Sequence, residues 1–101
     1  MKYNDEEKIL KSIMCNINLF DSFSSVYLFG SILQSSKKPH DIDILLIYSV
    51  YSEQVTKSAN NILSILNKES ELPIDLTVLS VSEEKEIKFI EKQNLNYLKI
   101  K

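Results

Sequence analysis

The sequence predicts a mixed α/β fold in which helices pack against a small β-sheet of three to four strands. Three observations support this prediction. Apolar residues recur at helical spacing in two long segments, residues 4–20 and 52–68. Short runs of strand-forming residues separate or follow these segments, at 26–29, 42–48 and 72–79. With 101 residues the chain has the length of one domain, which we expect to span residues 1–101.

The N-terminal part of the chain predicts a helix, a strand and a short helix. Residues 4–20 place their isoleucines on one helical face, and Asn4 or Asp5 can serve as the N-cap. The run at 26–29 is rich in strand formers. Residues 31–35 can form a short helix, after which lysines and a proline predict a loop.

The run at 42–48 is apolar throughout rather than alternating, which predicts a strand buried on both faces and central in the sheet. The long helix at 52–68 carries apolar residues one turn apart along one stripe. In the strand at 72–79, Pro73 fits only near the beginning or on an edge, because proline donates no ladder hydrogen bond.

The C-terminal part predicts a third long helix and a last strand. Ser80 and Glu83 have the spacing of a capping box, in which each side chain bonds the backbone of the other residue, and a helix can run from there to Lys92. Residues 95–100 can add a last strand.

Composition and charge exclude some classes of function. The longest apolar runs are far shorter than the roughly 20 residues of a membrane span, and the N-terminus has no signal-peptide pattern, so we expect a cytoplasmic protein. Cys15 is the single cysteine, which fits a reducing compartment. The net charge is -2 and all 12 basic residues are lysines, so tight binding to long nucleic acids is disfavoured.

The strand at 42–48 opens with a pair of acidic residues. Asp41 and Asp43 are two positions apart, so on a strand they share a face at a separation of roughly 6.5 to 7 Å. Carboxylate oxygens are the ligands that Mg²⁺ prefers, together with water and substrate phosphates. A pair of carboxylates at the start of a buried strand is costly unless something neutralises it, and a divalent cation can do so. Taken alone, the two aspartates could also be residues that protect a strand edge or lie in an exposed loop.

Asp75 occupies a comparable place near the start of the strand at 72–79. A neighbouring strand could bring it beside the pair. Three carboxylates in such an arrangement suit a two-metal site that binds both ions and activates an attacking hydroxyl.

Gly30 and Ser31 end the strand at 26–29 and begin the short helix. Glycine lets a phosphate approach the backbone where a Cβ would clash, and a helix N-terminus supplies amide donors. The Ser31 hydroxyl can add another donor. Together with the aspartates, these residues predict a site for a metal-bound polyphosphate.

The spacing in FGSILQSSKKPHDIDI, a Gly-Ser turn followed after nine residues by Asp-x-Asp, resembles the signature of the DNA polymerase β-like nucleotidyltransferase superfamily, especially its minimal stand-alone members. The later IDLTVL is similar to the strand that carries the third carboxylate of that family. The resemblance covers residues 26–84. Many minimal members carry Ala-Arg-Gly after the Gly-Ser turn, whereas this chain has Ile-Leu-Gln, which leaves the choice of base open.

The resemblance implies Mg²⁺-dependent transfer of a nucleoside monophosphate, AMP from ATP or the equivalent from another NTP, to a hydroxyl, with release of pyrophosphate. It implies that Gly30 and Ser31 hold the nucleotide phosphates and that Asp41 and Asp43 bind two Mg²⁺ ions. By the same resemblance, Asp75 completes the metal site and assists deprotonation of the acceptor.

Minimal members of this kind also resemble the antitoxin of two-component toxin–antitoxin modules, whose partner is a helical HEPN-type toxin that is AMPylated on tyrosine. The resemblance therefore implies a protein partner. Two alternatives remain: a catalytically silent module that binds nucleotide or neutralises a partner, and a nucleotidyltransferase for small molecules or RNA. The uncertain sheet edges also leave an oligomer possible.

Overall fold

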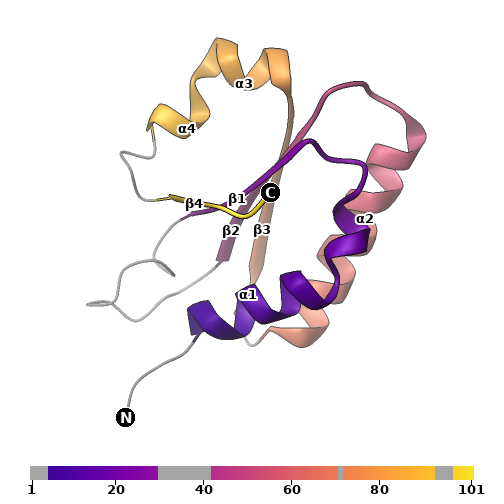
Figure 1. The fold of residues 1–101 in the computed structure, drawn as a ribbon, viewed down its shortest axis with the longest axis vertical. Coiled ribbons are helices and arrows are strands. Elements are labelled where there is room, and N and C mark those ends of the chain that lie inside the picture. The colour runs from indigo at the N-terminus through magenta and orange to yellow at the C-terminus, as the bar shows by residue number, and fades with distance from the viewer. Residues whose placement is uncertain (1–4, 30–41, 71, 93–96) are drawn as a thin grey trace.

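The computed structural model describes residues 5–29, 42–70, 72–92 and 97–101 (Figure 1). The elements, in chain order, are α1 (Asp5–Cys15), the 3₁₀ helix η1 (Ile17–Phe20), β1 (Ser25–Phe29), β2 (Ile42–Tyr48), α2 (Glu53–Glu69), β3 (Ile74–Ser80), α3 (Val81–Ile87), α4 (Phe89–Lys92) and β4 (Tyr97–Lys99). The short helix that the sequence predicts at 31–35 lies outside the described residues.

The described strands form one four-stranded sheet in the order β3-β2-β1-β4. β1 pairs antiparallel with β2 on one side and with β4 on the other, whereas β2 and β3 are parallel. The parallel pair requires a crossover connection, which α2 provides. The prediction of a mixed sheet of three to four strands with packed helices is therefore confirmed.

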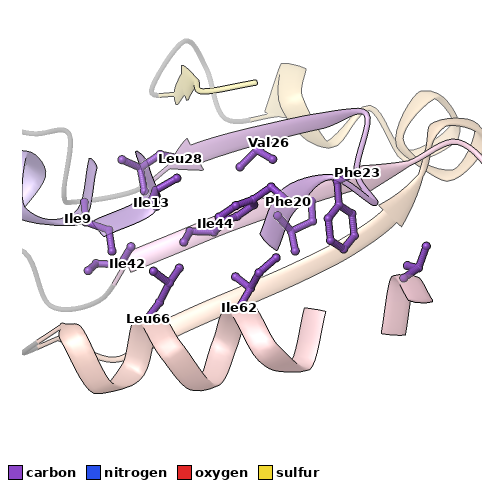
Figure 2. Close-up of a cluster of buried hydrophobic side chains, with 12 residues drawn as sticks. Ile9, Ile13, Phe20, Phe23, Val26, Leu28, Ile42, Ile44, Ile62 and Leu66 are labelled. Atoms are coloured by element: carbon purple, nitrogen blue, oxygen red, sulfur yellow. The ribbon is translucent and has the colours of Figure 1, made fainter. Parts of the chain in front are cut away.

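One face of the sheet carries the main hydrophobic core, against α1, η1 and α2 (Figure 1). In Figure 2, side chains from β1 and β2 point toward the side chains of α1, η1 and α2. The α2 stripe of Val55, Ile62 and Leu66 is buried, as its helical spacing predicts. The buried core residues are Ile9, Ile13, Phe20, Phe23, Val26, Leu28, Ile42, Ile44, Leu46, Val55, Ile62 and Leu66.

The other face of the sheet carries a smaller apolar cluster. Phe29, Leu45 and Ile47 are buried there, and residues from α3 and α4, among them Phe89, pack against them. The alternation along β2 explains the division, because Ile42, Ile44 and Leu46 belong to the first core and Leu45 and Ile47 to the second. This confirms that β2 is an interior strand buried on both faces.

The first predicted helix is shorter than expected, because the α-helix ends at Cys15 and a 3₁₀ helix follows. Asn16 causes the break: its backbone N–H and its side-chain Nδ2 both donate to the Ser12 carbonyl, at 3.2 and 2.8 Å. An asparagine side chain that bonds the backbone in this way competes with continuation of the helix. The change of direction lets Phe20 and Phe23 enter the core.

The helix predicted from Ser80 to Lys92 is split in two. Its start is confirmed, because the Ser80 hydroxyl accepts from the Glu83 N–H and the Glu83 carboxylate accepts from the Ser80 N–H. Lys88 has φ 53 and ψ 46, a left-handed conformation that ends α3. The Glu84 carboxylate then accepts from the Ile90 N–H at 3.0 Å, at the start of α4.

The strand bounds agree with the predicted ones to within a few residues. β2 spans the predicted residues 42–48, and β3 begins directly after Pro73, whose carbonyl accepts from the Ile42 N–H at 2.9 Å. β4 (Tyr97–Lys99) ends one residue before the predicted end at 100, and residues 95 and 96 of the predicted strand lie outside the described residues. Within the described segments, no helix combines the length and the hydropathy that crossing a membrane requires.

Candidate active site

Two of the predicted carboxylates lie side by side in the sheet. Asp43 of β2 and Asp75 of β3 are Cα partners in the parallel ladder. Neighbouring strands are about 4.8 Å apart, and partnered residues project from the same face. The sequence predicted that a neighbouring strand could bring Asp75 to the aspartate pair, and the register brings it to the level of Asp43.

The two carboxylates project from the face opposite the main core. Along β2, Asp43 alternates with Ile42 and Ile44, which belong to that core, and shares its face with Leu45 and Ile47. Asp43 is half-buried and Asp75 is exposed. The pair therefore lies at the margin of the smaller apolar cluster, with Asp75 open to a ligand from solvent.

The end of β1 is at the same level of the sheet. Phe29, the last residue of β1, is the Cα partner of Asp43. In the sequence Gly30 and Ser31 follow Phe29 directly, and Asp41 directly precedes the first residue of β2. Gly30, Ser31 and Asp41 lie outside the described residues, so their roles remain the predictions made from the sequence.

The carboxylate pair suits a hard divalent cation. Two anionic side chains on adjacent strands repel each other unless a cation lies between them, and Mg²⁺ prefers carboxylate oxygens. Across the described segments no cluster of three or more acidic, histidine or cysteine residues has the arrangement of a metal site. The third carboxylate that the sequence predicts is Asp41, which is outside those segments.

An aromatic cluster, which the sequence analysis did not identify, lies on the same face as the carboxylates. Its members are Tyr27, Phe29, Phe89 and Tyr97. Phe29 is the centre: its ring centroid is 5.5 Å from that of Phe89, 6.0 Å from that of Tyr97 and 6.1 Å from that of Tyr27. The signal in the sequence was the alternation of Tyr27 and Phe29 along β1, but Phe89 and Tyr97 join them only through tertiary contacts.

A cavity of about 400 Å³ lies away from the carboxylates, on the side of the main core. Ile9 and Leu72 line it, together with Lys8, Lys11 and Ile42. Ile42 belongs to the main core, so this cavity and Asp43 are on opposite faces of β2. The cavity is therefore no part of the candidate active site.

The sequence matches one family model, described as "Nucleotidyltransferase domain", over residues 7–101. The match includes every residue that the sequence analysis singled out for the site. No curated protein matches the sequence.

Solved structures resemble the fold at low sequence identity. A candidate nucleotidyltransferase from Sulfolobus solfataricus aligns with a TM-score of 0.52 and 17% identity, over 94% of this chain and 80% of the other. A mutant of the toxin–antitoxin complex MntA–HpeT aligns with a TM-score of 0.49 and 21% identity, over 95% of this chain and 71% of the other. A tri-AMPylated Shewanella oneidensis HEPN toxin in complex with MNT antitoxin aligns with a TM-score of 0.41 and 21% identity, over 73% of this chain and 55% of the other. At 17% identity, the match to the Sulfolobus solfataricus structure supports the fold alone.

Proposed function

The chain belongs to the nucleotidyltransferase domain family, and from this membership we propose that it transfers a nucleoside monophosphate, AMP from ATP, to a hydroxyl acceptor. The acceptor oxygen attacks the α-phosphorus of the nucleotide, and the bond from that phosphorus to the bridging oxygen breaks. Pyrophosphate leaves, and the acceptor proton passes to a carboxylate. The observation that carries the proposal is the register of Asp43 with Asp75.

The residue roles follow from the family resemblance and from this register. Asp43 and Asp75, with Asp41, would hold two Mg²⁺ ions, and the donor set fits because all of its ligands are hard oxygens. Bound Mg²⁺ would neutralise the charge on the triphosphate and on the departing pyrophosphate. Asp75 would accept the proton of the acceptor hydroxyl, since it is the exposed member of the pair. Gly30 and Ser31 would hold the β- and γ-phosphates.

For the acceptor, we propose a hydroxyl on a partner protein, a helical HEPN-type toxin that this chain neutralises as the antitoxin. The support is the resemblance of the Gly-Ser and Asp-x-Asp spacing to minimal nucleotidyltransferases. The absence of arginine and the net charge of -2 disfavour a long nucleic acid as acceptor.

The test incubates the purified protein and Mg²⁺ with nucleotide labelled at the α-phosphate, in the presence of a lysate of the source cells. We expect label from the α-phosphate on a discrete, protease-sensitive product that does not form when the purified protein is left out. Asp43→Asn and Asp75→Asn should each lower the transfer at least about 100-fold, the scale expected when one group that stabilises transition-state charge is lost. Asp21→Asn is the matched control, because Asp21 is an exposed aspartate in the turn after η1.

Other outcomes would change either the proposed function or the assignment of the site. Label that is sensitive to nuclease rather than protease would establish RNA as the acceptor. Mg²⁺-dependent nucleotide binding without any transfer would favour the catalytically silent module. Full transfer by Asp43→Asn would contradict the assignment of this site.

A further inference from the structure

β3 is the last strand of the described sheet, so one of its edges faces away from β2. The Ile42 N–H donates to the Pro73 carbonyl at 2.9 Å, and Ile42 is the Cα partner of Ile74. In a parallel ladder this bond fixes which residues of β3 bond to β2, namely those with odd numbers. The residues with even numbers direct their N–H and C=O groups toward the outer edge.

Side chains already close both ends of this outer edge. At its start, the Asn67 Oδ1 accepts from the Ile74 N–H at 3.2 Å. At its end, the Glu83 carboxylate accepts from the Ser80 N–H at 2.9 Å. Another strand can therefore pair with the edge only between Ile74 and Ser80.

Leu76 and Val78 form the open part of the edge. No described residue bonds their outward N–H and C=O groups, whereas their side chains pack against the main core. An exposed strand edge of this kind pairs with an extended peptide through the main chain. The open part begins directly after Asp75 in the sequence.

The outer edge of β3 is also on the side from which an acceptor hydroxyl has to arrive. Asp75 is exposed on this strand, whereas Asp43 has β1 on its other side. The phosphate-binding residues of the proposed function follow β1 in the sequence. In an in-line displacement the attacking oxygen approaches opposite to the leaving pyrophosphate. The acceptor therefore reaches the α-phosphorus from the β3 side.

We propose that an extended segment of the partner protein adds to the outer edge of β3 at Leu76 and Val78 and presents its acceptor hydroxyl to Asp75. The inference rests on the proposed function and names how the acceptor is bound. On this edge Asp75 is at a non-hydrogen-bonded position, where Cα atoms of antiparallel strands are only about 4.5 Å apart. A serine, threonine or tyrosine opposite Asp75 can pass its proton to the carboxylate while its oxygen bonds to the α-phosphorus and pyrophosphate leaves.

The charge beside the edge indicates the composition of this segment. α3 begins directly after β3 and carries Glu83, Glu84 and Glu86 but only one basic residue, Lys85. A segment that runs along β3 ends beside this acidic helix. We therefore expect lysine or arginine next to the acceptor residue, because complementary charge favours one partner over others.

A second copy of this chain fits the edge less well than a partner segment does. Two antiparallel β3 strands that use all the open groups of both copies place Leu76 opposite Val78. In this register Asp75 of one copy lies opposite Leu79 of the other. Leucine offers neither a hydroxyl nor a positive charge to the carboxylate.

The test uses the whole chain with Mg²⁺ and ATP labelled at the α-phosphate. The acceptor probe is a synthetic peptide with one tyrosine between valines and a lysine at each end. A comparison peptide is methylated on the backbone nitrogens that would face β3, which removes the donors but keeps every side chain. We expect the wild-type protein to label the first peptide about 5- to 100-fold more than the second, the scale of two lost backbone hydrogen bonds.

A pair of proline substitutions makes the same comparison on the protein. Val78→Pro removes an outward N–H that β2 does not use, so it should lower peptide labelling about 3- to 10-fold and leave Mg²⁺-ATP binding unchanged. Lys99→Pro in β4 is the matched control. The Ile100 N–H donates to the Val26 carbonyl, and the alternation of an antiparallel ladder then directs the Lys99 N–H away from β1. Lys99→Pro should label the peptide like the wild type.

The outcomes separate this inference from the proposed function. Wild-type protein that labels neither the peptide nor a lysate protein would contradict both. Labelling of a lysate protein without labelling of the peptide, or equal labelling by Val78→Pro, would contradict the edge alone. Equal labelling of the methylated peptide would also contradict it, and this result needs no variant. Wild-type protein that sediments as a dimer, with Val78→Pro as a monomer, would assign the edge to a second copy instead.

Discussion

Asp43 of β2 and Asp75 of β3 are partners in a parallel ladder, so two carboxylates from strands that are separated by a whole helix lie level on one face of the sheet. Neither residue is placed there by local structure. Each follows an apolar residue at the start of its strand, and the pairing of the strands sets the two side by side.

Mg²⁺ should raise the free energy of unfolding of the wild-type protein and leave that of Asp43→Asn unchanged. A ligand that binds only the folded state at ten to a hundred times its Kd adds about 1.4 to 2.7 kcal/mol. Thermal unfolding with Mg²⁺ and with EDTA measures the difference. Asp21→Asn should respond like the wild type. If Mg²⁺ does not change the thermal unfolding midpoint of the wild-type protein, the result argues against a metal site at Asp43 and Asp75.

Ile62→Ala should destabilise the fold by about 2 to 5 kcal/mol, because it removes a buried side chain and leaves a cavity. Ile62 is 0% exposed in the middle of α2, within the core of Figure 2. Urea unfolding gives the value. The control is Ile87→Ala, at a residue that is 42% exposed at the end of α3, where we expect a loss below about 1 kcal/mol. Equal losses at the two positions would mean that α2 does not form the core described above.

Ser80→Ala should cost about 1 kcal/mol of stability, the usual value of a lost N-cap. The Ser80 hydroxyl accepts the Glu83 N–H at 3.0 Å, and alanine leaves that donor without its partner. Ser82→Ala, at an exposed position in the first turn of α3, is the matched control and should be nearly neutral. Chemical unfolding curves of the three proteins make the comparison, and a neutral Ser80→Ala would show that α3 forms without its cap.

Lys88→Gly should stabilise the protein by about 0.5 to 1 kcal/mol. Lys88 has φ 53, which costs a residue with a Cβ about 1 to 2 kcal/mol. Glycine avoids this cost, but it loses more conformational entropy on folding, which cancels part of the stabilisation. Lys85→Gly, inside α3, should instead destabilise by about 1 kcal/mol. If both substitutions destabilise equally in thermal unfolding, α3 and α4 form one continuous helix in solution.

Most elements of this fold could be predicted from local patterns. β2 is buried on both faces, so its residues form a continuous apolar run in the sequence. α2 is buried on one face, so its apolar residues recur at helical spacing. The capping box at Ser80 is equally local. The breaks at Asn16 and Lys88 were not predicted, because both residues also occur inside helices, and the spacing of apolar residues reveals neither the bond from the Asn16 side chain to the Ser12 carbonyl nor the left-handed conformation of Lys88.

The candidate site also has features that the sequence determined and features that only the tertiary structure decided. The sequence by itself determined which side chains could do the chemistry: an aspartate at the start of each of two apolar strands, and a Gly-Ser turn after a third. Only the tertiary structure decided that Asp43 is level with Asp75 and that β3, which carries Asp75, is the last strand of the described sheet. The physical reason is that strand order and register depend on contacts between segments far apart in the chain, whereas alternation along one strand records only which face is buried.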